Sequence, residues 1–276
     1  MLSVRTDGAG IGGLPHALDD ATGLRERMAG KRFAVFLDYD GTLTPIVDRP
    51  EDAVISDEMR EVVRALAHRC TVCVVSGRDR AVVQELMGVD DLIVAGSHGF
   101  DIWSPEGGRI EREEGAGFAD LLRRVTQMVR EEVVAVNGAL IEPKTSSVAV
   151  HYRLVDQRDR PRIKDLVDRV LASHPEELRM TPGKMVYEIQ PKLEWDKGKA
   201  VLYLLEALEL DSDDVLPLYV GDDITDEDAF RALIGRGIGI LVADPADPEL
   251  AGRQTAAEYF LRDPAEVENL LDALAR

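Results

Sequence analysis

The sequence predicts an α/β protein with a Rossmann-like core, in which helices cover both faces of a parallel sheet, and an inserted α+β domain. Towards both ends of the chain, short runs that are apolar at every position alternate with amphipathic segments. Such runs are typical of strands that are buried on both faces of a parallel sheet. In the middle of the chain polar and apolar residues alternate, which is typical of an antiparallel sheet with one solvated face.

The elements of the predicted core follow from these patterns. The run Phe-Ala-Val-Phe-Leu at 33–37 predicts the central strand. Further strands are expected at 71–75, 92–95, 216–220 and 237–242. Helices are expected at 14–29 before Gly30, at 56–68 with Ser56 as N-cap, in a segment ending at Met87, and at 264–275. Because strands and helices alternate, the strands run parallel and ligands bind beyond their carboxyl ends.

The middle segment predicts a domain of its own. Its expected order is helix, two strands, helix and two strands, at 118–133, 139–141, 147–153, 161–173, 177–180 and 185–190. A crossover between parallel strands needs only about a dozen residues, which is far fewer than this middle segment contains. We therefore expect a leader and helix at 1–30, a core at 31–104 and 192–276, and an inserted cap at 105–191 with hinges near 104–108 and 188–192.

Composition excludes several classes of function. The chain has 276 residues and a net charge of −19, which argues against binding nucleic acid or an anionic membrane. No apolar run approaches the roughly 20 residues of a membrane span, and the first residues do not resemble a signal peptide. Cys70 and Cys73 have no second metal-binding pair, so we expect two buried thiols and a cytoplasmic location.

The N-terminal leader is rich in glycine. Gly8, Gly10 and Gly13 satisfy the spacing G-x-G-x-x-G, but no convincing strand precedes them. A dinucleotide-binding site needs such a strand before the glycines, and it needs an acidic residue further along the chain than the first ones that follow the glycines here. We interpret the leader as a flexible segment.

The strongest motif is Asp38-Tyr39-Asp40-Gly41-Thr42, directly after the predicted central strand. Two carboxylates at this spacing can share one site if the backbone turns, so that one attacks and the other transfers a proton. The alternative is a loop capped by Asx turns. The buried strand before the motif favours the catalytic interpretation.

A second acidic motif follows the strand at 216–220. Asp222 and Asp223 precede a predicted helix, and clustered carboxylates of this kind suit Mg²⁺. The alternative takes Thr225 as the N-cap and the next three acids as first-turn residues that complement the helix dipole. We keep that alternative for Glu227 and Asp228 only.

Two further motifs suggest a bound anion. Lys197 begins a predicted helix, where its charge opposes the helix dipole unless an anion is present. A solvated lysine is the alternative, and it suits Lys199 better. Ser76-Gly77-Arg78 offers a hydroxyl and backbone N–H groups that could cradle a phosphate, although an ordinary N-cap serine would look the same.

Together these motifs resemble the haloacid dehalogenase superfamily of phosphotransferases, and more closely its trehalose-phosphatase family. The resemblance covers nearly the whole chain from about residue 14, outside the Gly-rich leader. The similar stretches are 36–46, 75–78, 96–99, 142–144, 151–153, 188–191 and 195–198. The chain departs at Phe100-Asp101, where the family more usually has Ala-Glu.

The resemblance implies Mg²⁺-dependent hydrolysis of trehalose 6-phosphate, the last step of trehalose biosynthesis, through an aspartyl phosphate. Asp38 would be the nucleophile, Asp40 the acid and base, and Ser76 and Lys197 would bind the phosphoryl group. Mg²⁺ would be held by Asp38, the Asp40 backbone carbonyl and Asp222, with support from Asp223 and Asp226.

The resemblance also implies the substrate-binding residues, which are Gly77, Arg78, His98, Gly99, Glu142, Lys144 and Glu188. The last three would contact the distal glucose. Without the resemblance, Glu142 and Lys144 would be interpreted as a surface salt pair. The roles of His151 and Arg153 stay open between fold and substrate.

Two other functions remain as alternatives. One is a phosphatase for another sugar phosphate, such as a phosphorylated glycosyl glycerate. The other is a phosphosugar-sensing module without turnover. The presence of Asp38, Asp40, Lys197 and Asp222 disfavours it. The expected partner is a small phosphosugar, and association with a trehalose-phosphate synthase is a further expectation.

Overall fold

The computed structural model describes residues 9–19, 23–47, 49–110, 113–144, 146–183, 185–192, 195–250 and 252–276. Within the chain, contacts define two compact units. The first consists of Met1–Arg109 and Trp195–Arg276, and the second of Ile110–Glu194. Residues 105–109, which the sequence assigned to the insert, therefore group with the first unit.

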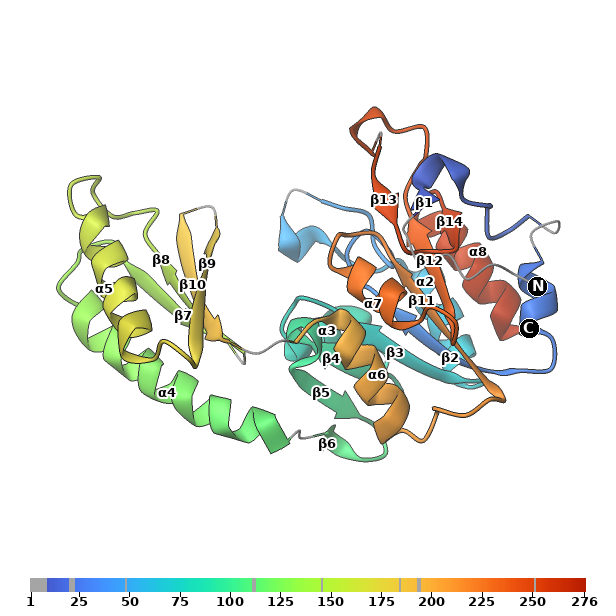
Figure 1. Ribbon diagram of the computed structural model, residues 1–276, viewed down its shortest axis with the longest axis horizontal. Helices are drawn as coiled ribbons and strands as arrows, with labels where there is room; N and C mark the ends of the chain where they lie inside the picture. The colour runs from blue at the N-terminus through green and yellow to red at the C-terminus, as the bar shows by residue number, and fades with distance from the viewer. Residues whose placement is uncertain are drawn as a thin grey trace. The chain divides into compact units, whose positions relative to one another are not determined.

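The first unit is built on an eight-stranded sheet with the order β14-β12-β11-β2-β3-β4-β5-β6 (Figure 1). Its central strand β2 (Arg32–Leu37) runs parallel to β11 (Val215–Gly221) and β3 (Thr71–Val75). The parallel pairing continues through β4 (Ile93–Gly96), β12 (Ile238–Val242) and β14 (Tyr259–Leu261). The predicted parallel core is thus confirmed.

Two strands at one edge of this sheet were not predicted. β5 (Asp101–Ser104) pairs antiparallel with β4, and β6 (Gly108–Ile110) lies beyond it. Both are short, and β5 begins only one residue after a 3₁₀ turn, η4 (Ser97–Gly99). Short strands of this kind carry little periodic signal in the sequence.

Helices cover both faces of the sheet (Figure 1). α2 (Asp57–Ala67), α3 (Arg80–Met87) and α8 (Pro264–Ala275) contribute to one hydrophobic cluster, which also contains Leu218 and Val220 of β11. Tyr219, between these two residues, points to the other face and packs against Phe230 of α7 (Asp226–Ala232). α6 (Lys197–Ala207) packs beside α7. As predicted, Ser56 caps α2 by accepting a hydrogen bond from the backbone N–H of Met59.

The N-terminal part differs from the prediction of a helix at 14–29. Only α1 (Leu24–Met28) is helical among the described residues of that segment. Residues before it pair with β14: the N–H of Phe260 donates to the carbonyl of Pro15, and the N–H of Ala17 donates to the carbonyl of Phe260. Tertiary pairing has overridden the helical periodicity here.

The leader is only partly described. Its residues 1–8, including Gly8, lie outside the described residues. β1 (Ala9–Gly10) pairs antiparallel with β13 (Gln254–Thr255), and a 3₁₀ turn, η1 (Ile11–Gly13), follows. This part of the leader is therefore tied to the core by a short sheet. Two further 3₁₀ turns are η3 (Pro50–Asp52) and η5 (Pro248–Leu250).

The second unit has the predicted α+β composition. Its sheet has the order β7-β8-β10-β9 and is antiparallel throughout, with β7 (Leu140–Pro143), β8 (Val148–His151), β9 (Leu178–Gly183) and β10 (Val186–Pro191). Its helices are α4 (Glu113–Val133) and α5 (Arg160–Ser173). They bury Val148, Val150 and Ile189 on one face of the sheet. The other face carries Glu142 and Glu188, which lie opposite Ala149.

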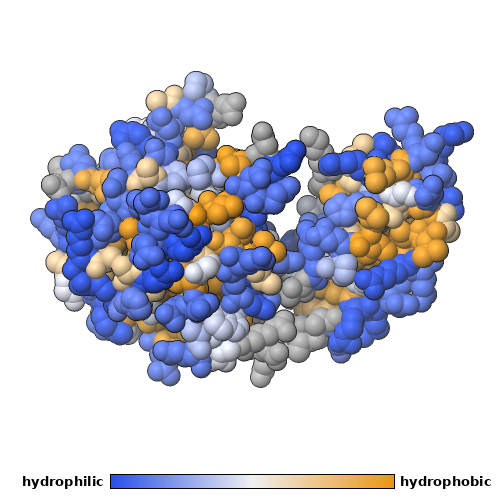
Figure 2. All heavy atoms as spheres, turned by 180° about the vertical axis from the view of Figure 1, so that it is seen from behind, coloured by the Kyte–Doolittle hydropathy of each residue, from blue (hydrophilic) through white to orange (hydrophobic). Residues whose placement is uncertain are grey.

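The surface agrees with the composition. Hydrophilic side chains cover most of the face shown in Figure 2, and hydrophobic ones form separate groups among them. Within the described part of the chain, no helix combines the length and the apolar character needed to cross a membrane.

Candidate active site

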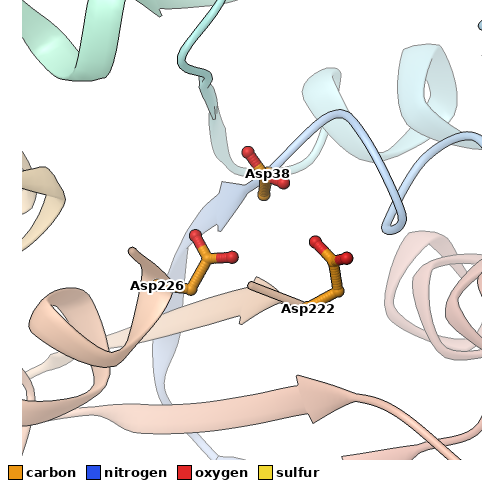
Figure 3. A group of neighbouring side chains, drawn as sticks. All are labelled: Asp38, Asp222 and Asp226. Carbon is orange, nitrogen blue, oxygen red and sulfur yellow. The ribbon is translucent and has the colours of Figure 1, made fainter. Parts of the chain in front are cut away.

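Three carboxylates meet at the carboxyl edge of the central sheet (Figure 3). Asp38 follows β2 and Asp222 follows β11, and these strands are neighbours in register from Val215 and Arg32 to Val220 and Leu37. The backbone N–H of Asp38 donates to the carbonyl of Val220 at 2.9 Å. Asp226, the first residue of α7, completes a group whose carboxylate oxygens lie within 4.8 Å of one another.

Lys197 is the cation within this group. Its side chain is buried, and Nζ donates to Oδ1 of Asp38 at 2.8 Å and to Oδ1 of Asp226 at 2.6 Å. Burial lowers the pKa of Lys197, but the charges of Asp38 and Asp226 outweigh burial and raise it overall, so the ammonium stays charged. In the fold Lys197 is thus paired with carboxylates, and its contact with a bound anion stays a prediction.

Asp226 is hydrogen-bonded at both oxygens. Oδ1 accepts from the Tyr219 hydroxyl at 2.6 Å in addition to Lys197, and Oδ2 accepts from the backbone N–H of Asp223 at 2.9 Å. Burial, and next the charge of Asp226, raise the pKa of Tyr219 well above its ordinary value, so the phenol remains a donor. These contacts direct Asp226 toward Lys197.

Asp222 has the acceptor that a cation would need. Its Oδ1 is buried and has no hydrogen-bond partner among the described residues. Burial, followed by the charges of Asp226 and Asp223, raises the pKa of Asp222 to about 7. Burial also raises the pKa of Asp38 well above its usual range, although Lys197 opposes this. Hard oxygen donors with excess negative charge fit Mg²⁺, which would favour the ionised form of both carboxyl groups.

Gly41 permits the close approach of the loop after Asp40 to Asp222. Its φ is +78°, and a Cβ at this position would lie 2.1 Å from Oδ2 of Asp222. A side chain is therefore excluded both by backbone conformation and by contact. This explains glycine at the fourth position of the motif that begins at Asp38.

Asp40 and Arg78 are paired with each other. The guanidinium donates from Nε to Oδ2 and from Nη2 to Oδ1 of Asp40, both at 2.6 Å. It also lies over the Tyr39 ring, with its Cζ 5.5 Å from the ring centroid. A predicted acid–base residue and a predicted substrate-binding residue thus form one bidentate pair.

Ser76 lies at the end of β3, beside the strand that carries Asp38. Its side chain is buried, and Oγ accepts from the backbone N–H of Arg78 at 3.2 Å. The next helix, α3, has Asp79 as its N-cap, so Ser76 is not the N-cap serine of the alternative interpretation. Its contact with a phosphate stays a prediction.

His98 lies next to this turn in a left-handed conformation, with φ of 57°. Its backbone N–H donates to the carbonyl of Ser76, and its own carbonyl accepts from Nε1 of Trp195 at 3.1 Å. A Cβ on Gly77 would lie 2.8 Å from the His98 ring, and a Cβ on Gly99 would lie 2.3 Å from Cβ of Ala200 in α6. Close packing thus gives both glycines a role in the fold.

The remaining predicted residues lie in the second unit. Glu142 of β7 and Glu188 of β10 are both opposite Ala149 of β8, so they share the sheet face that the helices leave uncovered. Glu188 accepts from Ser147 Oγ at 2.7 Å and from Lys144 Nζ at 3.4 Å.

The alternative of a Glu142–Lys144 salt pair is wrong. Oε2 of Glu142 instead lies 2.8 Å from Nε2 of His151, while Lys144 pairs with Glu188. These partners are brought together by the register of β7, β8 and β10, which sequence spacing does not show. The strand predicted to reach Arg153 ends at His151, and Arg153 is exposed after it.

Sequence reasoning missed Tyr219 and Arg253 near the acidic group, and it did not predict that Glu227 is buried. Tyr219 contacts Asp226, as described above. Arg253 donates from Nη1 to the backbone carbonyl of Asp222 at 3.1 Å. Glu227 does lie in the first turn of α7, but it is buried and accepts from the backbone N–H of Ala256 at 2.8 Å. For Tyr219 the one available signal is a hydroxyl-bearing residue inside an apolar strand.

Comparison with known proteins decides the family. A profile of the family described as trehalose-phosphatase matches residues 36–265. The chain belongs to the trehalose-phosphatase family. This assignment confirms the predicted family and the predicted enzyme class, a phosphoric monoester hydrolase.

Curated relatives and a solved structure agree with this assignment. The probable trehalose-phosphate phosphatase D of Arabidopsis thaliana is 40% identical over 271 residues, which cover 94% of this chain and 72% of the relative. Trehalose-phosphate phosphatase B of the same plant is 38% identical, with coverage of 94% and 71%. The structure of Aspergillus fumigatus trehalose-6-phosphate phosphatase matches with a TM-score of 0.66 at 28% identity, covering 95% of this chain and 99% of that one. The predicted fold class is confirmed.

We predict that Gly41→Ala loses stability and metal affinity together. The left-handed backbone alone costs about 1–2 kcal/mol of unfolding free energy, and the added methyl group displaces the Asp222 carboxylate. Urea unfolding and Mn²⁺ titration followed by electron paramagnetic resonance measure the two effects.

Gly235→Ala is the matched control for that experiment. Gly235 has φ of +79°, and a Cβ added there would meet no atom within 4 Å, so only the backbone cost applies. We expect reduced stability with unchanged Mn²⁺ affinity. Equal metal affinity in both variants would contradict the steric argument at Asp222.

We predict that stabilisation by Mg²⁺ increases with pH. Because the pKa of Asp222 in the folded protein is raised to about 7, the folded state holds a proton that the unfolded state releases, and the metal-free protein loses stability as pH rises from about 4 to about 7. Mg²⁺ binds the ionised carboxylate, and at a hundredfold excess over Kd it stabilises by about 2.7 kcal/mol. Thermal unfolding at about pH 5.5 and 8, with and without Mg²⁺, measures this.

Asp222→Asn should abolish the Mg²⁺-dependent rise in Tm at both pH values. Asp228→Asn, at a half-exposed carboxyl group on α7, should retain it. A rise in Tm that is independent of pH in the unaltered protein would show that Asp222 does not control metal binding.

Proposed function

We propose that this protein hydrolyses trehalose 6-phosphate to trehalose and phosphate. The observation that carries the proposal is the buried contact of Lys197 with Asp38, beside the unpartnered oxygen of Asp222. It is supported by membership of a family whose relatives are named trehalose-phosphate phosphatases. A carboxylate can attack a phosphate dianion only where such positive charge offsets their repulsion.

The reaction is proposed to proceed in two steps at Asp38. Its carboxylate attacks phosphorus and the bond from phosphorus to the sugar oxygen breaks, while Asp40 donates a proton to that oxygen. Asp40 then takes a proton from water, whose oxygen attacks the aspartyl phosphate and releases phosphate and free Asp38. In the structure both oxygens of Asp40 accept from Arg78, so this pair would have to open at one oxygen for Asp40 to carry the proton that it donates.

Other groups neutralise and orient the phosphoryl group. Lys197 would contact its oxygens, and Ser76 would donate a hydrogen bond from its hydroxyl. Asp38, the Asp40 backbone carbonyl and Asp222 would hold Mg²⁺, with Asp223 and Asp226 in support. When bound, Mg²⁺ supplies charge neutralisation for the phosphoryl oxygens.

Sugar recognition is proposed for two groups of residues, each described within its own unit. Glu142, Lys144 and Glu188 provide carboxylates and an ammonium on one sheet face, which suit a ligand with many hydroxyl groups and no charge. A site built to bond hydroxyls discriminates against substrates that lack them. In the first unit, Gly77, Arg78, His98 and Gly99 are proposed to line the substrate path. The inserted unit would then act as a cap that moves about the predicted hinges near residues 104–108 and 188–192.

We predict a strong preference for trehalose 6-phosphate in phosphate release. The panel contains trehalose 6-phosphate, glucose 6-phosphate, sucrose 6-phosphate, mannosylglycerate phosphate and p-nitrophenyl phosphate, each with Mg²⁺. Asp38→Asn should abolish turnover because an amide cannot form the acyl phosphate. EDTA should stop the reaction, and added Mg²⁺ should restore it.

The panel separates the alternatives. Preference for another sugar phosphate, or weak and uniform activity, would retain the phosphatase chemistry and reject this substrate. No release from a folded, metal-loaded protein would favour a phosphosugar-sensing module. An active Asp38→Asn protein would reject the aspartyl-phosphate mechanism.

We predict that Glu142→Ala reduces kcat/KM for trehalose 6-phosphate by about 10–100-fold and leaves p-nitrophenyl phosphate nearly unaffected. The expected size is that of a hydrogen bond to a charged group. Glu176→Ala, at an exposed glutamate before β9 in the same unit, is the control and should change neither substrate. An equal loss for both substrates would remove Glu142 from sugar recognition.

Association with a trehalose-phosphate synthase and a cytoplasmic location stay predictions from the sequence. Co-purification of a differently tagged synthase tests the first.

A further inference from the structure

Tyr219 has an unusual place in the central sheet. Its neighbours Leu218 and Val220 belong to the apolar cluster under α2 and α8, whereas its own ring packs edge-on against Phe230 at a centroid distance of 5.7 Å. The side chain is completely buried. A buried phenol requires a hydrogen-bond acceptor, and here the acceptor is Asp226 at 2.6 Å.

The acceptor is the same oxygen that binds Lys197. Oδ1 of Asp226 receives both the Tyr219 hydroxyl and Nζ of Lys197, each at 2.6 Å, and Nζ continues to Asp38 at 2.8 Å. The line of contacts thus runs from the phenol through one carboxylate and the ammonium to the second carboxylate. All four side chains are buried.

A buried ion pair keeps a defined geometry only when further hydrogen bonds satisfy its remaining acceptors. The phenol supplies such a bond without adding charge. It occupies one direction at Oδ1 of Asp226, so the ammonium has to approach from the other. Without the phenol, Lys197 can move further onto Asp226 and away from Asp38.

We propose that Tyr219 is a positioning residue for phosphoryl transfer, which fixes Asp226 so that Lys197 is held toward Asp38. The inference rests on the proposed function, because it assigns Lys197 to the phosphoryl group. Tyr219 itself touches none of the reacting atoms. Packing alone would be satisfied by phenylalanine, so the hydroxyl is the group that the proposal explains.

The test is Tyr219→Phe, which removes one oxygen and keeps the ring. We expect kcat for trehalose 6-phosphate to fall by about 10–100-fold with KM changed less than about twofold, as for an interaction that matters in the transition state. Inhibition by orthovanadate, a probe of the phosphoryl site, should weaken by a similar factor. Inhibition by the neutral product trehalose should not change.

Two further variants separate positioning from fold. Tyr259→Phe removes the hydroxyl of another buried tyrosine, on β14, and should leave kcat unchanged. In an Asp226→Asn background, Tyr219→Phe should have little additional effect, because the contact that it breaks has already been altered.

Each outcome decides the proposal. An unchanged kcat, a loss that is fully additive with Asp226→Asn, or an equal loss in Tyr259→Phe would overturn it. So would a Tyr219→Phe protein without the circular dichroism spectrum of the unaltered protein, since the hydroxyl would then serve the fold. If the unaltered protein hydrolyses none of the phosphate esters, or Asp38→Asn stays active, the proposed function fails first and this inference fails with it.

Discussion

The site depends on an excess of buried negative charge. Asp38, Asp222 and Asp226 place carboxylate oxygens within 4.8 Å of one another, and the ammonium of Lys197 meets two of them. One positive charge cannot balance three carboxylates in a buried region, and burial accordingly raises the pKa of Asp222. The same excess that disfavours the ionised state without metal would favour binding of a divalent cation. The fold has to tolerate this charge imbalance, which would serve the proposed metal binding.

The fold accommodates these charges by bringing the backbone segments that carry the carboxylates close to one another. Parallel pairing of β2 with β11 brings the residues after both strands to one edge. Glycine then removes the side chains that would separate the carboxylates: a Cβ on Gly41 would touch Asp222, and a Cβ on Gly221 would lie 2.4 Å from Cγ of Asp226. The loop between β11 and α7 supplies the backbone N–H of Asp223 to Asp226. The ends of β2 and β11 and the start of α7 therefore set the distances between the charges.

The sequence predicted this centre because its signals are local. Continuous apolar runs indicate parallel strands. The motif that begins at Asp38 and the acidic motif that begins at Asp222 each follow such a strand, so the topology of the sheet brings them together. Contacts that depend on tertiary register could not be predicted. One is the pairing of His16 with β14, where a helix was expected. Others are the separate partners of Glu142 and Lys144, which are His151 and Glu188, and the acceptor of the Tyr219 hydroxyl. The antiparallel β5 was missed because its sequence, Asp-Ile-Trp-Ser, shows neither a continuous apolar run nor an alternation of polar and apolar residues.

The two sets of polar pairs differ in how easily they exchange partners. Lys197 and Asp38 are 3% and 6% exposed, so breaking their contact leaves a charge without solvent. Glu142 and His151 are 53% and 40% exposed, and water or a sugar hydroxyl can replace either partner at little free-energy cost. Arg78 with Asp40 lies between these cases, since the carboxylate is 42% exposed and the guanidinium 16%. The groups proposed to hold charge for phosphoryl transfer are thus fixed by burial, while the groups proposed to bind the sugar stay exchangeable.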